Sequence, residues 1–185
     1  FLVPYNRNTA AIFDPVANTL TDVPGTYTVP GGFSAGVLLP DGRVFMVPHQ
    51  STTARIYDPV TNITSVAGGT YPGNYAFNAG TLLADGRVFL VPGNSTSARI
   101  YDPVANTVST PVGVYPGNNA LKSGTLLMDG RVFMTPANSS SARVYDPYTG
   151  VVTTLPDVYP LNNFVNTVLL PNGVAMMVPT SNNRC

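Results

Sequence analysis

The stretch "ADGRVFLVPGNSTSARIYDPVANT" (residues 84–107) decides the fold, because closely similar text occurs at a fixed spacing elsewhere in the chain. "PDGRVFMVPHQSTTARIYDPVTNI" lies 44 residues before it, and "MDGRVFMTPANSSSARVYDPYTGV" lies 44 residues after it. A degenerate copy, "NGVAM", begins at Asn172 and is shifted by one residue. A regular period of this length is typical of an array in which one small structural unit is repeated.

Each 44-residue unit is predicted to form four short antiparallel strands. The apolar run 79–84 is followed by Asp-Gly, a strong hairpin signal, and 87–92 reads as a second strand. Residues 98–101 read as a third strand, and an Asp-Pro turn leads to a weaker fourth strand at 107–112. One unit buries too little apolar surface to offset the entropy lost on ordering it, so neighbouring units must stack. The sequence therefore predicts an all-β protein, a β-propeller built from four-stranded blades.

The pattern of an apolar strand, "DGRVF", a loop and "YDPVTN" resembles the kelch-type repeat, including the version found in galactose-oxidase-like proteins. The resemblance covers essentially the whole chain. It departs from the family where Gly-Gly is replaced by Val47-Pro48, Val91-Pro92 and Thr135-Pro136, and the chain contains no Trp. The resemblance implies a propeller with more blades than the four or so repeats present here.

Residues 1–185 are predicted to be a single repeat region. Its expected divisions are a partial blade at 1–30, blades at about 33–70, 77–114 and 121–158, and a partial blade at 164–185. Because neither end falls at a blade boundary, we expect the chain to be part of a larger array. Further blades or self-association would then complete the ring.

Composition bears on several classes of partner. Nine Lys and Arg residues balance nine acidic ones, and neither sign forms a run, so no nucleic-acid partner is expected. No apolar run approaches the roughly 20 residues of a membrane span. The only cysteine is Cys185, which excludes an internal disulfide. Glu is absent and Lys122 is the only lysine, and this shortage of helix-favouring charged residues supports the all-β prediction.

Seven of the nine aspartates recur in two turns and are predicted to be structural. One set stands before Gly, where a type I′ turn favours Asp, and the other stands before Pro, where a carboxylate can accept a backbone hydrogen bond two residues on. The alternative is a ring of Asp–Arg pairs that binds an ion or an anion. The seven residues are Asp14, Asp41, Asp58, Asp85, Asp102, Asp129 and Asp146.

The loops between these turns are the candidate ligand-contact surface. In a four-stranded meander the Asp-Gly and Asp-Pro turns lie at one edge, and the remaining connections lie at the opposite edge. The sequence of the first edge is nearly invariant between units, whereas that of the second differs. Amide, hydroxyl and aromatic groups there suit a glycan or a protein, although soluble loop tips would have a similar composition. The candidate residues are Asn6, Arg7, His49, Gln50, Tyr71, Asn74, Tyr75, Asn94, Tyr115, Asn118, Asn119, Lys122 and Asn138.

Three asparagines, Asn62, Asn94 and Asn138, begin Asn-X-Ser/Thr sequences and are possible glycosylation sites if the protein follows a eukaryotic secretory route.

The sequence contains no evident active site. His49 is the only histidine, and Ser51 is too close to it in sequence to be a usual triad partner. A copper site needs several converging His and Tyr ligands, and the chain has neither a phosphate-binding glycine motif nor a Cys/His metal cluster. We therefore expect a protein that is not an enzyme and has no cofactor.

The prediction that follows is a noncatalytic binding or structural module that contacts a glycan or a protein through its variable loops. Low charge and the near absence of lysine favour an extracellular or virion-surface location. Two alternatives remain: a scaffold fragment of a larger galactose-oxidase-like enzyme, and a repeat subunit of a filament or particle.

Overall fold

The computed structural model describes residues 1–25, 27 and 30–180, and all regular structure in these ranges is β-strand. Cys185 lies outside the described residues.

Three sheets contain four antiparallel strands each, paired in sequence order. The first comprises β3 (Phe33–Leu38), β4 (Val44–Pro48), β5 (Arg55–Asp58) and β6 (Ile63–Val66). The second comprises β7 (Phe77–Leu82), β8 (Val88–Pro92), β9 (Arg99–Asp102) and β10 (Thr107–Ser109). The third comprises β11 (Leu121–Leu126), β12 (Val132–Pro136), β13 (Arg143–Tyr145) and β14 (Val152–Thr154).

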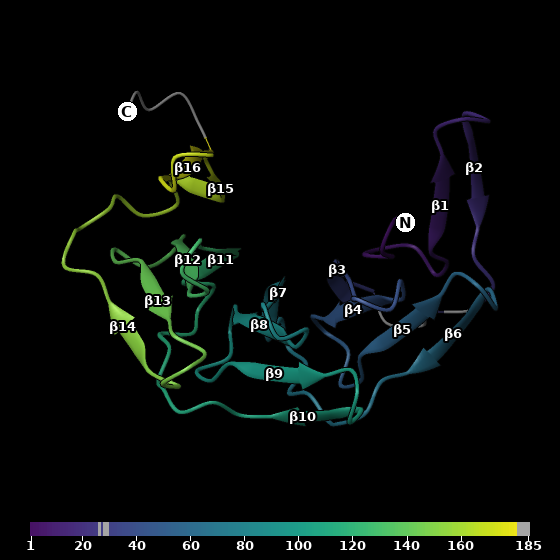
Figure 1. Cartoon of the computed structure of the whole chain (residues 1–185), viewed down its shortest axis with the longest axis horizontal. Helices are drawn as coiled ribbons and strands as arrows, with labels where there is room; N and C mark the ends of the chain where they lie inside the picture. Colours follow the sequence, from purple (N-terminus) through teal and green to yellow (C-terminus); the bar gives the residue numbers. More distant parts are fainter. Residues whose placement is uncertain (26, 28–29, 181–185) are drawn as a thin grey trace.

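Two-stranded sheets flank these three. β1 (Ala11–Asp14) pairs with β2 (Thr19–Asp22), and Leu2 bridges to Ala11. At the other end β15 (Phe164–Leu169) pairs with β16 (Ala175–Pro179). The five sheets follow one another around an open arc, with β3, β7, β11 and β15 toward its inside and β6, β10 and β14 at its periphery (Figure 1). The predicted fold, a partial β-propeller of four-stranded antiparallel units, is confirmed.

The hydrophobic core lies between sheets. Each of four buried clusters draws its residues from two neighbouring sheets. Phe45 stacks on Tyr101 of the next sheet with ring centroids 4.5 Å apart, and Phe89 stacks on Tyr145 at 4.6 Å. Such pairs contribute about 0.5–1.5 kcal/mol beyond area burial. The repeated aromatic positions therefore join one unit to the next, and a unit is stable only beside a neighbour.

Glycines on the inner strands permit this close approach. A Cβ on Gly80 would lie 2.7 Å from methyl groups of both Val37 and Val47. Thr167 takes the equivalent place in β15, where the contact is polar. The Thr167 hydroxyl lies 2.6 Å from the Thr135 hydroxyl, and the Thr135 hydroxyl lies 2.7 Å from the Ser123 hydroxyl. At this position the last interface is joined by hydrogen bonds, whereas at Gly80 the contact is with valine methyl groups.

The Asp-Gly turns differ from the predicted type I′ form. Gly42 has a φ of 87°, whereas Asp41 is not among the residues with positive φ, and the Gly42 N–H donates to the Leu39 carbonyl at 3.0 Å. This is a type I turn followed by a left-handed glycine, which makes a three-residue loop. The Asp41 carboxylate accepts the Arg43 N–H at 3.1 Å and pairs with the Arg43 guanidinium, which favours the longer loop. Asp85 and Asp129 repeat the arrangement.

The Asp-Pro turns end on a left-handed residue. Asp102 Oδ1 accepts the Val104 N–H at 2.9 Å, and Asn106, with a φ of 51°, closes the turn. Asn106 Oδ1 accepts the Tyr101 hydroxyl at 2.8 Å and the Gly68 N–H of the preceding connection at 2.8 Å. This turn therefore also ties one unit to the next. Asp14, Asp58 and Asp146 accept equivalent backbone hydrogen bonds.

The described part of the chain contains no helix that could cross a membrane.

Candidate functional site

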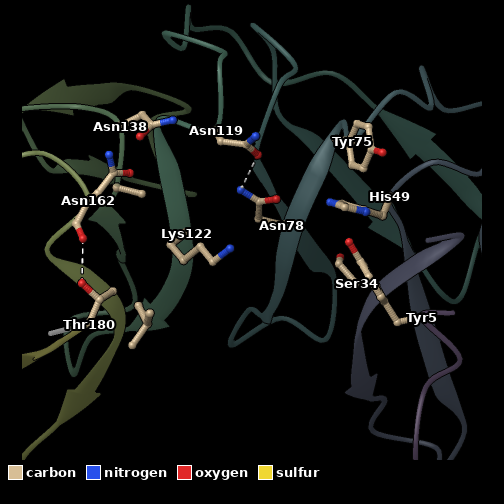
Figure 2. Close-up of a pocket in the computed structure, with 12 residues that line it drawn as sticks. Tyr5, Ser34, His49, Tyr75, Asn78, Asn119, Lys122, Asn138, Asn162 and Thr180 are labelled. Atoms are coloured by element: carbon tan, nitrogen blue, oxygen red, sulfur yellow. Dashed lines mark hydrogen bonds between the residues drawn. The ribbon is translucent and has the colours of Figure 1, made fainter.

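A groove of about 720 Å³ opens at the edge where the loops differ between units (Figure 2). Its lining comes from the inner strands β3, β7, β11 and β15, from the loops beside them and from the N-terminal segment, so no single unit forms it. It is lined by Tyr5, Ser34, His49, Tyr75, Asn78, Asn119, Lys122, Ala137, Asn138, Asn162, Val165 and Thr180.

Three equivalent positions per unit supply most of this lining. The first directly follows β4, β12 and β16 and holds His49, Ala137 and Thr180, and Tyr5 takes the same place after the N-terminal residues 1–4. The second is the second residue of the inner strand and holds Ser34, Asn78, Lys122 and Val165. The third lies two residues before the inner strand and holds Tyr75, Asn119 and Asn162. Side chains therefore change at positions that the repeated backbone brings to one surface.

The third position has a left-handed backbone in each unit. Tyr75, Asn119 and Asn162 have φ values of 59°, 54° and 59°, and Gly31 at the equivalent place has 66°. Gly and Asn tolerate this conformation, but for a bulky residue such as tyrosine it costs roughly 1–2 kcal/mol. The backbone at Tyr75 is thus strained where its side chain enters the groove.

One wall of the groove is a row of three aromatic rings. The ring centroids of Tyr5 and His49 are 5.6 Å apart, and those of His49 and Tyr75 are 4.9 Å apart with the rings nearly perpendicular. His49 is only 7% exposed, whereas Tyr5 is 47% and Tyr75 is 38% exposed. The two tyrosines therefore offer ring surface to solvent, and the imidazole between them is buried.

His49 is held in the neutral form. Burial lowers the pKa of His49, and the charge of Lys122 acts in the same direction, while hydrogen bonds to Gly31 and Asn78 partly oppose the shift. His49 Nδ1 lies 3.2 Å from the Gly31 carbonyl, which can only accept, so Nδ1 carries the proton of the neutral ring. Figure 2 shows the imidazole directed toward Asn78.

The opposite side is built from amides and one cation. Asn78 Nδ2 donates to the Leu121 carbonyl at 2.7 Å and to Asn119 Oδ1 at 3.3 Å, which fixes both amides. Asn138 Nδ2 donates to the Asn118 carbonyl at 3.0 Å. Lys122 is exposed and extends its amine into the groove (Figure 2). Among the described residues that line the groove, none is acidic.

The predicted contact residues are distributed unevenly. His49, Tyr75, Asn119, Lys122 and Asn138 meet in the groove. Others lie elsewhere: Gln50 lines a separate hollow with Tyr27 and Arg55, Asn6 and Arg7 lie at a further one, and Asn74, Asn94 and Asn118 are outside the groove lining.

Two of the predicted contact residues require correction. Tyr71 and Tyr115 are only 2% and 1% exposed and belong to the clusters between sheets, so they are not contact residues. Tyr71 packs edge-to-face on Phe77 at the start of the inner strand, and this contact draws it inward.

The three possible glycosylation sites remain predictions. Asn62 is exposed and accepts the Tyr57 hydroxyl at 3.0 Å, and its own φ is 56°. The Asn94 amide donates to the Asn74 carbonyl at 3.3 Å, as Asn138 does to Asn118. All three asparagines therefore have a structural role beside any modification.

Sequence reasoning missed seven of the residues that line the groove. These are Ser34, Asn78 and Val165 on the inner strands, together with Tyr5, Ala137, Asn162 and Thr180. A signal was present: the inner strands begin "FSAG", "FNAG" and "LKSG", and the second residue changes between units that otherwise agree closely.

Within the described residues, no group of three or more His, Cys, Asp or Glu side chains is placed to hold a metal ion.

Comparisons with known proteins place the fold. No protein-family model and no curated protein sequence matches this chain. Its structure is similar to virginiamycin B lyase from Staphylococcus aureus, with a TM-score of 0.77 at 12% identity over 94% of this chain and 57% of that one. It is also similar to a streptogramin B lyase, with a TM-score of 0.69 at 11% identity over 97% of this chain and 64% of that one.

A third similar structure is the extracellular domain of the putative one component system BT4673 from B. thetaiotaomicron, with a TM-score of 0.70 at 11% identity over 93% of this chain and 24% of that one. This chain spans less than two thirds of each of the three proteins. At such low identity the likeness shows the all-β, repeated-blade propeller fold alone.

Proposed function

We propose that this chain is a noncatalytic binding module, a divergent kelch-like propeller that takes a glycan into the groove of Figure 2. One observation carries the proposal: two of the three lining positions hold a different residue in every unit and the third holds Gly, Tyr or Asn, although the strands and turns that hold them are closely similar. Packing alone does not require this variation, because the equivalent strands fold with Ser34, Asn78, Lys122 or Val165 at the same place.

The chemistry of the lining supports a sugar. Fixed amides and hydroxyls can exchange hydrogen bonds with sugar hydroxyls, and exposed tyrosine rings offer apolar faces against which a pyranose ring can stack. The strain at Tyr75 points the same way, since backbone strain concentrates at functional positions and glycine or asparagine would relieve it.

An extracellular or virion-surface setting belongs to the same proposal. Its support is the low charge of the chain and the likeness of its fold to an extracellular bacterial domain.

The test uses Tyr75→Gly on an oligosaccharide array and in calorimetric titrations. Gly31 has the equivalent backbone conformation, so the variant is expected to keep the fold while losing the ring. We expect affinity for the bound oligosaccharide to fall at least about tenfold, an effect typical of losing one well-placed contact. Tyr148→Gly serves as the control, because Tyr148 is 77% exposed in an Asp-Pro turn at the opposite edge. Unchanged binding by Tyr75→Gly, or no oligosaccharide bound by the wild type, would contradict the proposal.

One observation favours a second candidate, an enzyme that acts on its ligand in this groove. His49 lines the groove and burial lowers its pKa, so an imidazole in the neutral form that a general base requires is present there. The structures of similar fold also include a catalytically inactive variant of virginiamycin B lyase with quinupristin. Mass spectrometry of each bound oligosaccharide after incubation separates the two functions: a new product that disappears with His49→Asn would establish catalysis.

A further inference from the structure

Lys122 stands apart from the other cations of the described structure. It is the only lysine of the chain, it is the second residue of β11, and it is exposed with its amine directed into the groove (Figure 2). The four ion pairs among the described residues all use arginine, and none lies in the groove lining. The positive charge of Lys122 is therefore not neutralised by any acidic residue of the described groove.

The strand does not need this charge. The equivalent residues Ser34, Asn78 and Val165 are neutral, and each lies at the same register shift near the start of its inner strand. A lysine at this place therefore adds a function rather than stability. An unpaired cation in a concave site favours an anionic ligand, because the walls of the site concentrate its field.

The residues around Lys122 indicate which other groups an anionic ligand of the groove would carry. Figure 2 shows Lys122 on one side of the groove and the row of Tyr5, His49 and Tyr75 on the other, with Asn78 and Asn119 between them. A ligand that spans this distance meets a cation at one end, amides along its middle and aromatic rings at the other end. Burial keeps His49 neutral, which leaves Lys122 as the positive charge of the site.

We propose that the groove recognises an acidic sugar, with its carboxylate bound by Lys122 and a ring of the same oligosaccharide packed against Tyr5 and Tyr75. The charge-assisted hydrogen bond from the ammonium group would supply the preference for the acidic over the neutral form. This inference rests on the proposed glycan-binding function and deepens it by naming the ligand class.

The experiment compares matched pairs that differ in charge. Oligogalacturonate is titrated against its methyl ester, and sialyllactose against lactose, with the wild type and with Lys122→Met. We expect the wild type to bind the acidic member of at least one pair tenfold or more tightly. Lys122→Met should remove this preference by lowering the affinity for the acidic member at least about tenfold more than that for the neutral member, and rising salt should weaken mainly the acidic complex.

Two further variants make the test specific. Arg131→Met removes the same charge at the opposite edge, where Arg131 pairs with Asp129 at 2.6 Å, and should leave binding unchanged. Val165→Lys places a second cation at the equivalent position of β15, where Val165 is 41% exposed, and should tighten binding of the acidic member severalfold. Thermal unfolding of each variant verifies that the fold is retained.

The two proposals fail in different ways. Equal binding of acidic and neutral members, or an acidic preference that survives Lys122→Met, would overturn the assignment of Lys122 and leave glycan binding standing. Binding of acidic peptides or sulfated sugars in place of carboxylated ones would also overturn it. No binding of any oligosaccharide would overturn the proposed function, and this inference with it.

Discussion

His49 occupies a place that Tyr5, Gly93, Ala137 and Thr180 hold in the other units, so the repeated backbone accepts rings, small residues and a hydroxyl there. What distinguishes His49 is its burial between two tyrosines in the groove. The fold therefore favours the uncharged imidazole, whereas an unfolded chain accepts its proton near the ordinary pKa of 6.5.

This difference predicts how stability depends on pH. Because the folded-state pKa of His49 is lowered, the unfolded state takes up the proton first, and the free energy of unfolding should fall as the pH drops below about 6.5. His49→Asn, which retains an N–H donor for Gly31, should abolish this dependence. Urea unfolding at pH values between about 7.5 and 5.5 measures this pH dependence. The range lies below the pH at which tyrosine and lysine titrate and above that at which aspartate titrates.

The titratable and charged groups that face His49 are Tyr5, Tyr75 and Lys122. A Lys122→Met protein should therefore retain the dependence in weaker form. If His49→Asn unfolds with the same pH profile as the wild type, another group controls stability in this range and the argument is wrong.

Among the elements, the Asp-Pro turns offer an internal comparison, because equivalent left-handed asparagines differ only in their partners. Asn106 accepts both the Tyr101 hydroxyl and the Gly68 N–H. In the first unit the residue equivalent to Tyr101 is Phe13, which has no hydroxyl to donate to Asn18.

Replacement by glycine retains the backbone conformation and removes only the side chain. We expect Asn106→Gly to lower the free energy of unfolding by about 1–3 kcal/mol, since two donors lose their acceptor, and Asn18→Gly to change it by less than about 0.5 kcal/mol. Urea unfolding of both variants provides the comparison. Equal effects at the two sites would show that the hydrogen bonds of Asn106 do not stabilise the interface.

The elements were more predictable from sequence than the site. Strands, repeat period and turn positions depend on local pattern, and "DGRVF" and "YDP" are strong local signals. The prediction of a type I′ Asp-Gly turn was wrong because the loop has three residues. In the first complete sheet the additional residue is Pro40. The burial of His49 was not visible in the sequence, because it depends on Tyr5 and Tyr75, which are 44 and 26 residues away.

Val165 illustrates the same limit. Its place in the groove follows from a connection that is one residue shorter than the others: Tyr159 precedes Phe164 by five residues, whereas Tyr115 precedes Leu121 by six. A strict 44-residue alignment therefore pairs Lys122 with Asn166, and only the strand register shows that Val165 is the equivalent residue.

The whole molecule is an open arc, and its two terminal sheets differ from the inner ones. Each four-stranded sheet packs against a neighbour on both faces, while β1–β2 and β15–β16 each pack against one. The β15–β16 sheet leaves Val168 45% and Met176 51% exposed.

Hydrogen exchange should follow this arrangement. We expect amides of β8 and β12 to exchange at least about 100-fold more slowly than those of β2 and β16, because the terminal sheets open without disturbing the rest. Mass spectrometry of the exchanged protein measures this gradient. Uniform protection along the chain would contradict it, and protection of β16 that increases with protein concentration would show that a second copy covers the terminal sheet.

The near identity of successive units has a consequence at the level of the gene. Duplication or loss of one unit in the gene would change the chain by a whole multiple of the 44-residue period. Because each inner interface uses the same aromatic pair and the same valine–glycine contact, an inserted unit finds matching faces on both sides. Such an event would lengthen the arc by one sheet and add three new positions to the groove, so the ligand surface can diversify by copying before any point mutation occurs.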